Sequence, residues 1–129
     1  MVRRFGLDID CADPASLARF WAEALGYASP DAPQDEQNAW AMLEPPEPGL
    51  PDVFFQRVPE GKVAKNRVHL DLRVGGDGPA DERRTKINAE AARLVALGAS
   101  DHRGPIDEAG SYWVRMNDPE GNEFCLVGG

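Results

Sequence analysis

A short alternating pattern near the start of the chain returns about sixty residues later. Gly6-Leu7-Asp8-Ile9-Asp10 and His69-Leu70-Asp71-Leu72-Arg73 both alternate polar and apolar residues, which is typical of a strand with one buried face. Each copy leads into a helical pattern, and the two helices end alike, in Ala24-Leu25-Gly26 and Ala96-Leu97-Gly98. The repeat therefore predicts one compact body built from two similar halves.

The first half reads as a strand, a helix and two further strands. Residues 3–11 alternate as the first strand, and Asp13-Pro14 is typical of a helix start, because Asp accepts bonds from free backbone N–H groups and Pro fits the first helical position. Gly26 is placed to end this helix. Strands are expected at Trp40–Leu43 and 52–58, with a proline-rich loop at 44–51 between them. The apolar stripe of the helix comprises Leu17, Phe20, Trp21, Ala24 and Leu25.

The second half repeats the order. A strand is expected at 67–74, followed by a glycine-rich break at 75–79 and a helix that ends at Gly98. Strands near Ser111–Asn117 and Glu123–Val127 flank a hairpin at 118–121, while residues 101–104, which include His102, read as an exposed loop without a role. We expect the inner face of the second helix to carry Ile87, Ala91, Leu94 and Val95.

Composition and charge limit the partners of this chain. Its 129 residues suffice for one domain with a core. A formal net charge of −8 argues against nucleic acid and against anionic membrane surfaces. No apolar run reaches the roughly 20 residues that span a bilayer, and the residues after Arg3 and Arg4 do not resemble a signal peptide. Cys11 and Cys125 are expected to be free thiols in a reducing cytoplasm.

The polar faces of the repeated strands predict the site. Because the apolar faces should pack on the helices, the polar side chains are expected to line a shared cavity. Carboxylates, an imidazole and an amide can together bind a divalent metal ion or perform acid–base chemistry. The candidate catalytic residues are His69, Asp71 and Glu123, and the candidate metal ligands are His69 with Gln56 or Glu123. The predicted pocket comprises Asp8, Asp10, Gln56, His69, Asp71, Arg73, Trp113, Glu123 and Cys125.

Structural alternatives stay open for several of these residues. Asp8 and Asp71 can instead bond nearby backbone or pair with Arg73. Cys125 reads as a small buried hydrophobic residue, or as a reactive thiolate if a cation lies beside it. Trp40 and Trp113 fall in strands, where they either line the pocket or pack beneath it. Nucleotide-dependent chemistry has no support, since the chain has no glycine-rich phosphate loop.

Four stretches, 7–21, 55–60, 66–72 and 118–125, resemble the vicinal oxygen chelate superfamily in its glyoxalase-like branch. The resemblance implies an α+β fold of two βαβββ modules that form curved mixed sheets around a shared pocket, and commonly a homodimer. The modules would span about 3–58 and 67–127 of a single domain, 1–129, with a connector at about 59–66. Family ligand positions fall at Gly6, Gln56 (or Phe55), His69 and Cys125.

Three functions are compatible with this resemblance, which covers glyoxalase I, extradiol dioxygenases, epimerases, thiol transferases and bleomycin-binding proteins. The first is a protein that binds a small molecule, cationic or aromatic, in a cleft between the modules and needs no cofactor. The alternative is a metal-dependent lyase or isomerase with His69 as a ligand of a divalent metal ion. A metal-free enzyme would use His69 with Asp71 or Glu123 as acid and base.

Overall fold

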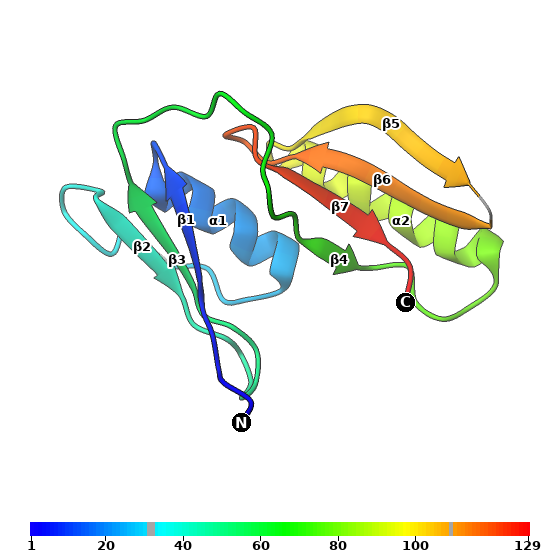
Figure 1. Ribbon diagram of the computed structural model, residues 1–129, viewed down its shortest axis with the longest axis horizontal. Coiled ribbons are helices and arrows are strands. Elements are labelled where there is room, and N and C mark those ends of the chain that lie inside the picture. Colours follow the sequence, from blue (N-terminus) through cyan, green and yellow to red (C-terminus); the bar gives the residue numbers. More distant parts are fainter. Residues whose placement is uncertain (31–32, 109) are drawn as a thin grey trace. The chain divides into compact units, whose positions relative to one another are not determined.

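The protein is described by a computed structural model that covers residues 1–30, 33–108 and 110–129, without the side chains of residues 102 and 103. The chain divides into unit 1, Met1–Gly61, and unit 2, Lys62–Gly129. Each unit has one helix on one face of a sheet (Figure 1).

Unit 1 contains β1 (Leu7–Cys11), α1 (Pro14–Leu25), β2 (Trp40–Leu43) and β3 (Val53–Arg57). Its sheet has the order β1-β3-β2, with β1 parallel and β2 antiparallel to β3 (Figure 1). The predicted bounds of β2 are confirmed, while β1 and β3 are shorter than expected. Because β1 begins only at Leu7, Phe5 lies outside the sheet and is 69% exposed.

The signals that begin and end α1 act as predicted. The Asp13 carboxylate accepts a hydrogen bond from the backbone N–H of Ser16 at 3.2 Å, and Pro14 occupies the first turn. Gly26 ends the helix with φ +76°, a conformation that glycine adopts without steric cost. The helix buries Leu17, and its Phe20 and Trp21 rings meet edge to face at 5.6 Å. Local sequence therefore determines this element.

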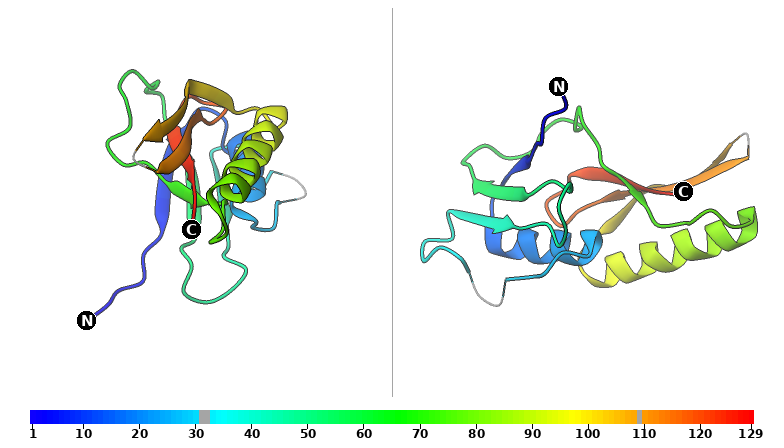
Figure 2. Two further views of the ribbon diagram at one scale, coloured as in Figure 1. Left: turned by 90° about the vertical axis from the view of Figure 1, so that its right-hand side faces the viewer. Right: turned by 90° about the horizontal axis from the view of Figure 1, so that it is seen from below.

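Unit 2 contains β4 (Asp71–Arg73), α2 (Ala80–Ala96), β5 (Ser100–Glu108), β6 (Ser111–Asn117) and β7 (Glu123–Val127). The sheet order is β4-β7-β6-β5, with β4 parallel to β7 and the other pairs antiparallel. α2 runs along one face of this sheet (Figure 2). Unit 2 is thus a complete βαβββ module, and the predicted bounds of β6 and β7 are confirmed.

Three predictions for unit 2 are wrong. β4 does not extend over 67–74, because the segment before Asp71 bonds to other groups, so His69 lies outside the strand. Residues 101–104 belong to β5 instead of a loop; Gly104 and Pro105, which suggested the loop, accompany a shift of register inside the strand. Val95 is 48% exposed, whereas Ile87 and Leu94 are buried as expected.

The hairpin between β6 and β7 depends on Asp118, which is 3% exposed. One carboxylate oxygen accepts the backbone N–H groups of Glu120 and Asn122 at 2.8 and 3.0 Å. The other oxygen accepts the Asn122 side-chain amide at 2.8 Å. The predicted hairpin is confirmed, and the structure gives Asp118 a structural role in it.

The fold class is confirmed as α+β with mixed sheets. In the parts of unit 1 that the structure describes, two strands follow the helix, compared with three in unit 2. In the described part of the segment between α1 and β2, side-chain hydrogen bonds take the place of strand pairing. The Asn38 side chain bonds the Asp13 carboxylate and the backbone N–H of Ala15. No helix in the described ranges is long and apolar enough to span a bilayer.

Candidate functional site

The face of the unit 1 sheet opposite α1 carries a mixed polar and aromatic set of side chains. Residues at alternate positions share this side, because successive side chains on a strand point to opposite faces. Asp8 and Met42 flank Phe54 in the register, and Asp10 and Trp40 flank Gln56. We call this set the open face of unit 1: Asp8, Asp10, Trp40, Met42, Phe54 and Gln56.

Two aromatic rings stack on the open face of unit 1. The Trp40 and Phe54 ring centroids are 6.0 Å apart with planes inclined by 13°. Trp40 is 38% exposed, and Asp10 and Gln56 beside it are exposed too. Large aromatic groups are usually covered, so a stacked pair at the surface is a ready contact for another flat apolar group.

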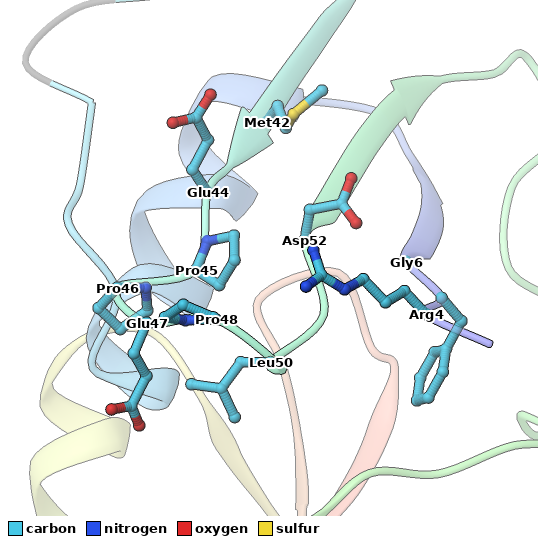
Figure 3. A pocket seen from close by; sticks show the side chains of 11 residues that line it. Arg4, Gly6, Met42, Glu44, Pro45, Pro46, Glu47, Pro48, Leu50 and Asp52 are labelled. Carbon is cyan, nitrogen blue, oxygen red and sulfur yellow. The ribbon is translucent and has the colours of Figure 1, made fainter. Parts of the chain in front are cut away.

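A cavity of about 700 Å³ continues the open face of unit 1 at the end of its strands (Figure 3). Met42 belongs to both, and the next row beyond Asp8 consists of Gly6, Asp52 and Glu44. This cavity was not predicted from the sequence. The sequence feature that indicates the cavity is the proline-rich loop, which has an acidic residue at each end, Glu44 and Asp52. We call it the proline groove: Arg4, Phe5, Gly6, Met42, Glu44, Pro45, Pro46, Glu47, Pro48, Leu50 and Asp52.

Gly6 makes room for the Asp52 carboxylate. A Cβ atom on Gly6 would lie 2.5 Å from Asp52 Oδ1, well inside van der Waals contact. The backbone N–H of the next residue, Leu7, donates to the Asp52 carbonyl at 2.9 Å. The position at which the resemblance places a family ligand therefore has no side chain of its own, and the carboxylate of Asp52 takes that space.

The unit 2 sheet likewise has an open face opposite α2. In its register Asp71 and Arg115 flank Cys125, and Asn117 lies opposite Glu123. Arg73 and Trp113 share this face by strand alternation. Five residues of the predicted pocket are thus together on one sheet face: Asp71, Arg73, Trp113, Glu123 and Cys125.

Cys125 is not activated as a nucleophile. It is partly buried, and this burial raises the pKa of its thiol; the neighbouring Asp71 carboxylate raises the pKa further, against smaller opposite effects of Arg115 and Lys65. A thiol with a raised pKa is protonated at neutral pH and reacts slowly. The structure supports the reading of Cys125 as a small apolar residue, although it is not fully buried.

The connector before β4 holds Glu123. Lys62 Nζ lies 3.1 Å from Glu123 Oε1, and the Asn66 backbone N–H lies 3.3 Å from both carboxylate oxygens. Burial acts to raise the pKa of Glu123, but the bonds from Lys62 and Asn66 outweigh it, so this pKa lies below its ordinary value. Glu123 is consequently a structural carboxylate that fastens the connector to β7.

His69 belongs to the same network through Asn66. It is exposed, and its Nε2 lies 3.1 Å from the Asn66 carbonyl oxygen. Because a carbonyl only accepts, Nε2 carries the hydrogen in this contact. The neutral ring then offers only Nδ1 as an acceptor.

The donor atoms of unit 2 do not fit a divalent metal ion as they are arranged. His69 Nε2 and the Glu123 oxygens, the expected ligands, already bond to the connector. Gln56 belongs to unit 1. Within each unit, over the residues that the structure describes, no three His, Cys, Asp or Glu side chains form a group that could hold a metal. A metal site here would require these bonds to be exchanged for metal–ligand bonds.

Removing the Lys62 charge is expected to weaken the protein in a pH-dependent way. At pH 7, Lys62→Gln should lower the free energy of unfolding by about 1 kcal/mol, since it removes a charged hydrogen bond from a mostly buried carboxylate. The folded pKa of Glu123 is depressed, so this stability is present above the ordinary pKa of 4.5 and is lost as the pH falls through the lowered value.

Urea unfolding from pH 7 down to pH 3 measures this effect. The difference between Lys62→Gln and the wild type should shrink below about pH 4.5. Lys65→Gln removes the same charge from the same connector and is the matched control. A difference that stays constant across this range would show that the ion pair does not hold Glu123.

Comparison with known proteins identifies the family. The glyoxalase-like domain family matches residues 6–127. The chain belongs to this glyoxalase-like family, and the predicted membership of the vicinal oxygen chelate superfamily is confirmed. No curated protein sequence matches the chain.

Solved structures share the fold at low sequence identity. A protein from Agrobacterium tumefaciens has a TM-score of 0.69 at 15% identity, over 99% of this chain and 98% of that one. A glyoxalase/bleomycin resistance protein/dioxygenase family enzyme from Burkholderia phytofirmans has 0.66 at 14%, over 95% and 94%. The oxidase ChaP-H1 has 0.64 at 17%, over 100% and 97%. These likenesses establish the fold, and the superfamily includes enzymes.

The predicted site residues other than His69 thus fall into two groups. Asp8, Asp10 and Gln56 are together on the open face of unit 1, and the strand residues of the second half are together in unit 2. His69 lies in the connector. The expectation that both groups line one shared cavity stays a prediction.

Proposed function

We propose that this protein binds a small aromatic molecule and that the open face of unit 1 is the principal contact surface. Binding, and not turnover, is the proposed role. The observation that carries the proposal is the stacked pair of Trp40, which is 38% exposed, and Phe54, which is partly buried, on a sheet face that also presents carboxylates and an amide.

The chemistry of this face supports the proposal. A third flat ring can extend the stack of Trp40 and Phe54, which favours aromatic compounds over aliphatic ones. Gln56 and Asp10, in the same row as Trp40, can fix the orientation of a ligand through hydrogen bonds. The proline groove beside this face has a volume of about 700 Å³, within the range of small-molecule sites.

Truncating Trp40 should weaken binding while the fold persists. Screening the wild type by thermal shift against aromatic compounds that are cationic, neutral or anionic gives the ligands to test. For compounds that raise the melting temperature, Trp40→Ala should raise Kd about 3- to 10-fold in calorimetry, the effect of losing one stacking contact. Leu97→Ala, a truncation at a similarly exposed apolar residue (43%) in unit 2, is the control and should leave Kd unchanged. Equal effects of both substitutions would refute the assignment.

The alternative is a metal-dependent lyase or isomerase with His69 as a ligand. His69 and Glu123 both bond to Asn66, which places the imidazole and the carboxylate in one network. This alternative requires His69 and Glu123 to break their hydrogen bonds to Asn66. Metal analysis of the wild type and His69→Ala, purified without chelators, tests it: one metal ion per wild-type chain, lost in the variant, would favour it, and substoichiometric metal in both would remove it.

We infer a cytoplasmic location and a homodimeric state as parts of the same proposal. The cytoplasmic location is supported by Cys11 and Cys125, neither of which forms a disulfide bond among the described residues, as suits a reducing compartment. The homodimer follows from the family resemblance. The acidic net charge of −8 disfavours nucleic acid as a partner.

A further inference from the structure

The negative charge of this protein is concentrated in unit 1. Residues 1–61 contain 11 Asp and Glu against 4 Lys and Arg, whereas residues 62–129 contain 11 against 10. Unit 1 therefore carries seven of the eight net negative charges, although the two units are similar in length. Charge of one sign around a concave surface raises the local concentration of ions of the opposite sign.

The proline groove combines this charge with a rigid apolar wall. Three prolines, with Phe5 and Leu50, supply apolar surface, and Phe5 and Leu50 are 69% and 42% exposed. Proline has a fixed φ, so this wall loses little conformational freedom when a ligand is bound. The prolines of the wall are Pro45, Pro46 and Pro48.

Three carboxylates surround that wall: Glu44, Glu47 and Asp52. Among the described residues, the salt bridges engage other side chains and none of these three. Arg4 is the one cationic residue of the groove lining and extends into it near Asp52 (Figure 3). The carboxylates thus surround a cavity of about 700 Å³ with more negative than positive charge.

We propose that the proline groove is a binding subsite for an organic cation, an amine or quaternary ammonium group attached to an apolar body. The positive group lies against Asp52 and Glu44, and the apolar body lies against the proline wall and Met42. Since Met42 also belongs to the open face of unit 1, an aromatic part of the same ligand can reach the Trp40–Phe54 stack. The inference rests on the proposed function for that last contact only.

Gly6 and Tyr27 prepare the position of Asp52. Gly6 leaves the space that the carboxylate occupies. The Tyr27 hydroxyl donates to the carbonyl oxygen of Pro51 at 2.6 Å and so fixes the residue before Asp52. Because the acceptor is held in place before binding, a ligand does not have to order it.

The test compares two benzyl compounds that differ in charge: benzyltrimethylammonium, a cation, and benzyl alcohol, which is neutral. Titration followed by amide chemical shifts at low ionic strength should show binding of the cation at least about 10-fold tighter. Asp52→Asn should weaken the cation about 5- to 10-fold. Arg4→Gln should strengthen it, because it removes a like charge from the groove.

Glu36→Gln is the matched control. Glu36 is an exposed carboxylate of unit 1 outside the groove, so its substitution changes the net charge by the same amount as Asp52→Asn. It should change cation binding less than about 2-fold, because Glu36 is exposed to water and does not line the groove. Melting curves of all variants establish that each is folded.

Equal affinity for both probes, or equal effects of Asp52→Asn and Glu36→Gln, would overturn the subsite. The two proposals fail separately. If neutral aromatic compounds bind through Trp40 and charge makes no difference, the subsite is wrong and the proposed function stands. If the cation binds through Asp52 while Trp40→Ala has no effect, the subsite stands and the aromatic contact is wrong.

Discussion

Replacing Asp118 with alanine is expected to lower the free energy of unfolding by about 3 kcal/mol. The substitution leaves the backbone N–H groups of Glu120 and Asn122 without their acceptor, in a turn where Asp118 itself is 3% exposed. Each buried donor that loses its partner costs about 1–3 kcal/mol. The effect should be on stability, because these hydrogen bonds hold the hairpin between β6 and β7.

Urea unfolding followed by circular dichroism measures this loss. Asp118→Asn keeps one oxygen acceptor and the size of the side chain, and should cost clearly less than Asp118→Ala. Asp77→Ala, at an exposed acidic residue of the same unit, should change stability by less than about 0.5 kcal/mol. If Asp118→Ala and Asp77→Ala are equally mild, the turn does not depend on the Asp118 carboxylate.

Truncation of two adjacent phenylalanines should have different effects on stability and on ligand binding. Phe55 is 0% exposed on the α1 side of β3, so Phe55→Ala should cost about 3–5 kcal/mol of stability through the cavity it leaves. Phe54 lies on the open face and stacks on Trp40. Phe54→Ala should cost only about 1 kcal/mol of stability but should weaken aromatic ligands.

The pair tests which face of the sheet is the core and which one binds. Unfolding free energies and calorimetric Kd values are measured for both variants, and Phe55→Leu serves as a folded reference for the core position. Similar stability losses for Phe54→Ala and Phe55→Ala would contradict the assignment of the faces. If Phe54→Ala leaves the Kd of aromatic ligands unchanged, Phe54 is not part of the proposed contact.

Elements with strong local signals were predictable from the sequence. Asp13 and Gly26 mark the ends of α1 by hydrogen bonding and by backbone conformation, and neither depends on distant residues. The bounds expected for β2, β6 and β7 match those in the structure. The glyoxalase-like family was also predictable, because its matching stretches extend over most of the chain.

Elements that depend on distant contacts were not predictable. The connector before the expected strand bonds Glu123 through Asn66 and Lys62, and His69 bonds the Asn66 carbonyl and lies outside β4. β5 was missed because Gly104 normally indicates a loop, whereas its partner strand accommodates the irregularity.

The candidate site was predictable only in part. Strand alternation placed Asp8 and Asp10 together on one strand face, and Asp71 and Arg73 together on another strand's face, as the sheet registers have them; that these faces line one cavity stays a prediction. The proline groove was missed because it depends on the approach of Asp52 to Gly6. These residues directly precede β3 and β1, and only the pairing of those two strands brings them together. The bonds from Lys62 and Asn66 to Glu123 were not predictable either, because they join residues that are far apart in the sequence.

The central claim is that unit 1 contacts the ligand through its open face. Chemical-shift mapping of the isotope-labelled protein, titrated with the aromatic compound that raises its melting temperature most, tests this claim directly. We predict saturable shifts of the Trp40 indole N–H and of the backbone amides of Phe54 and Gln56. Saturable binding that leaves these resonances of β2 and β3 unchanged would contradict it.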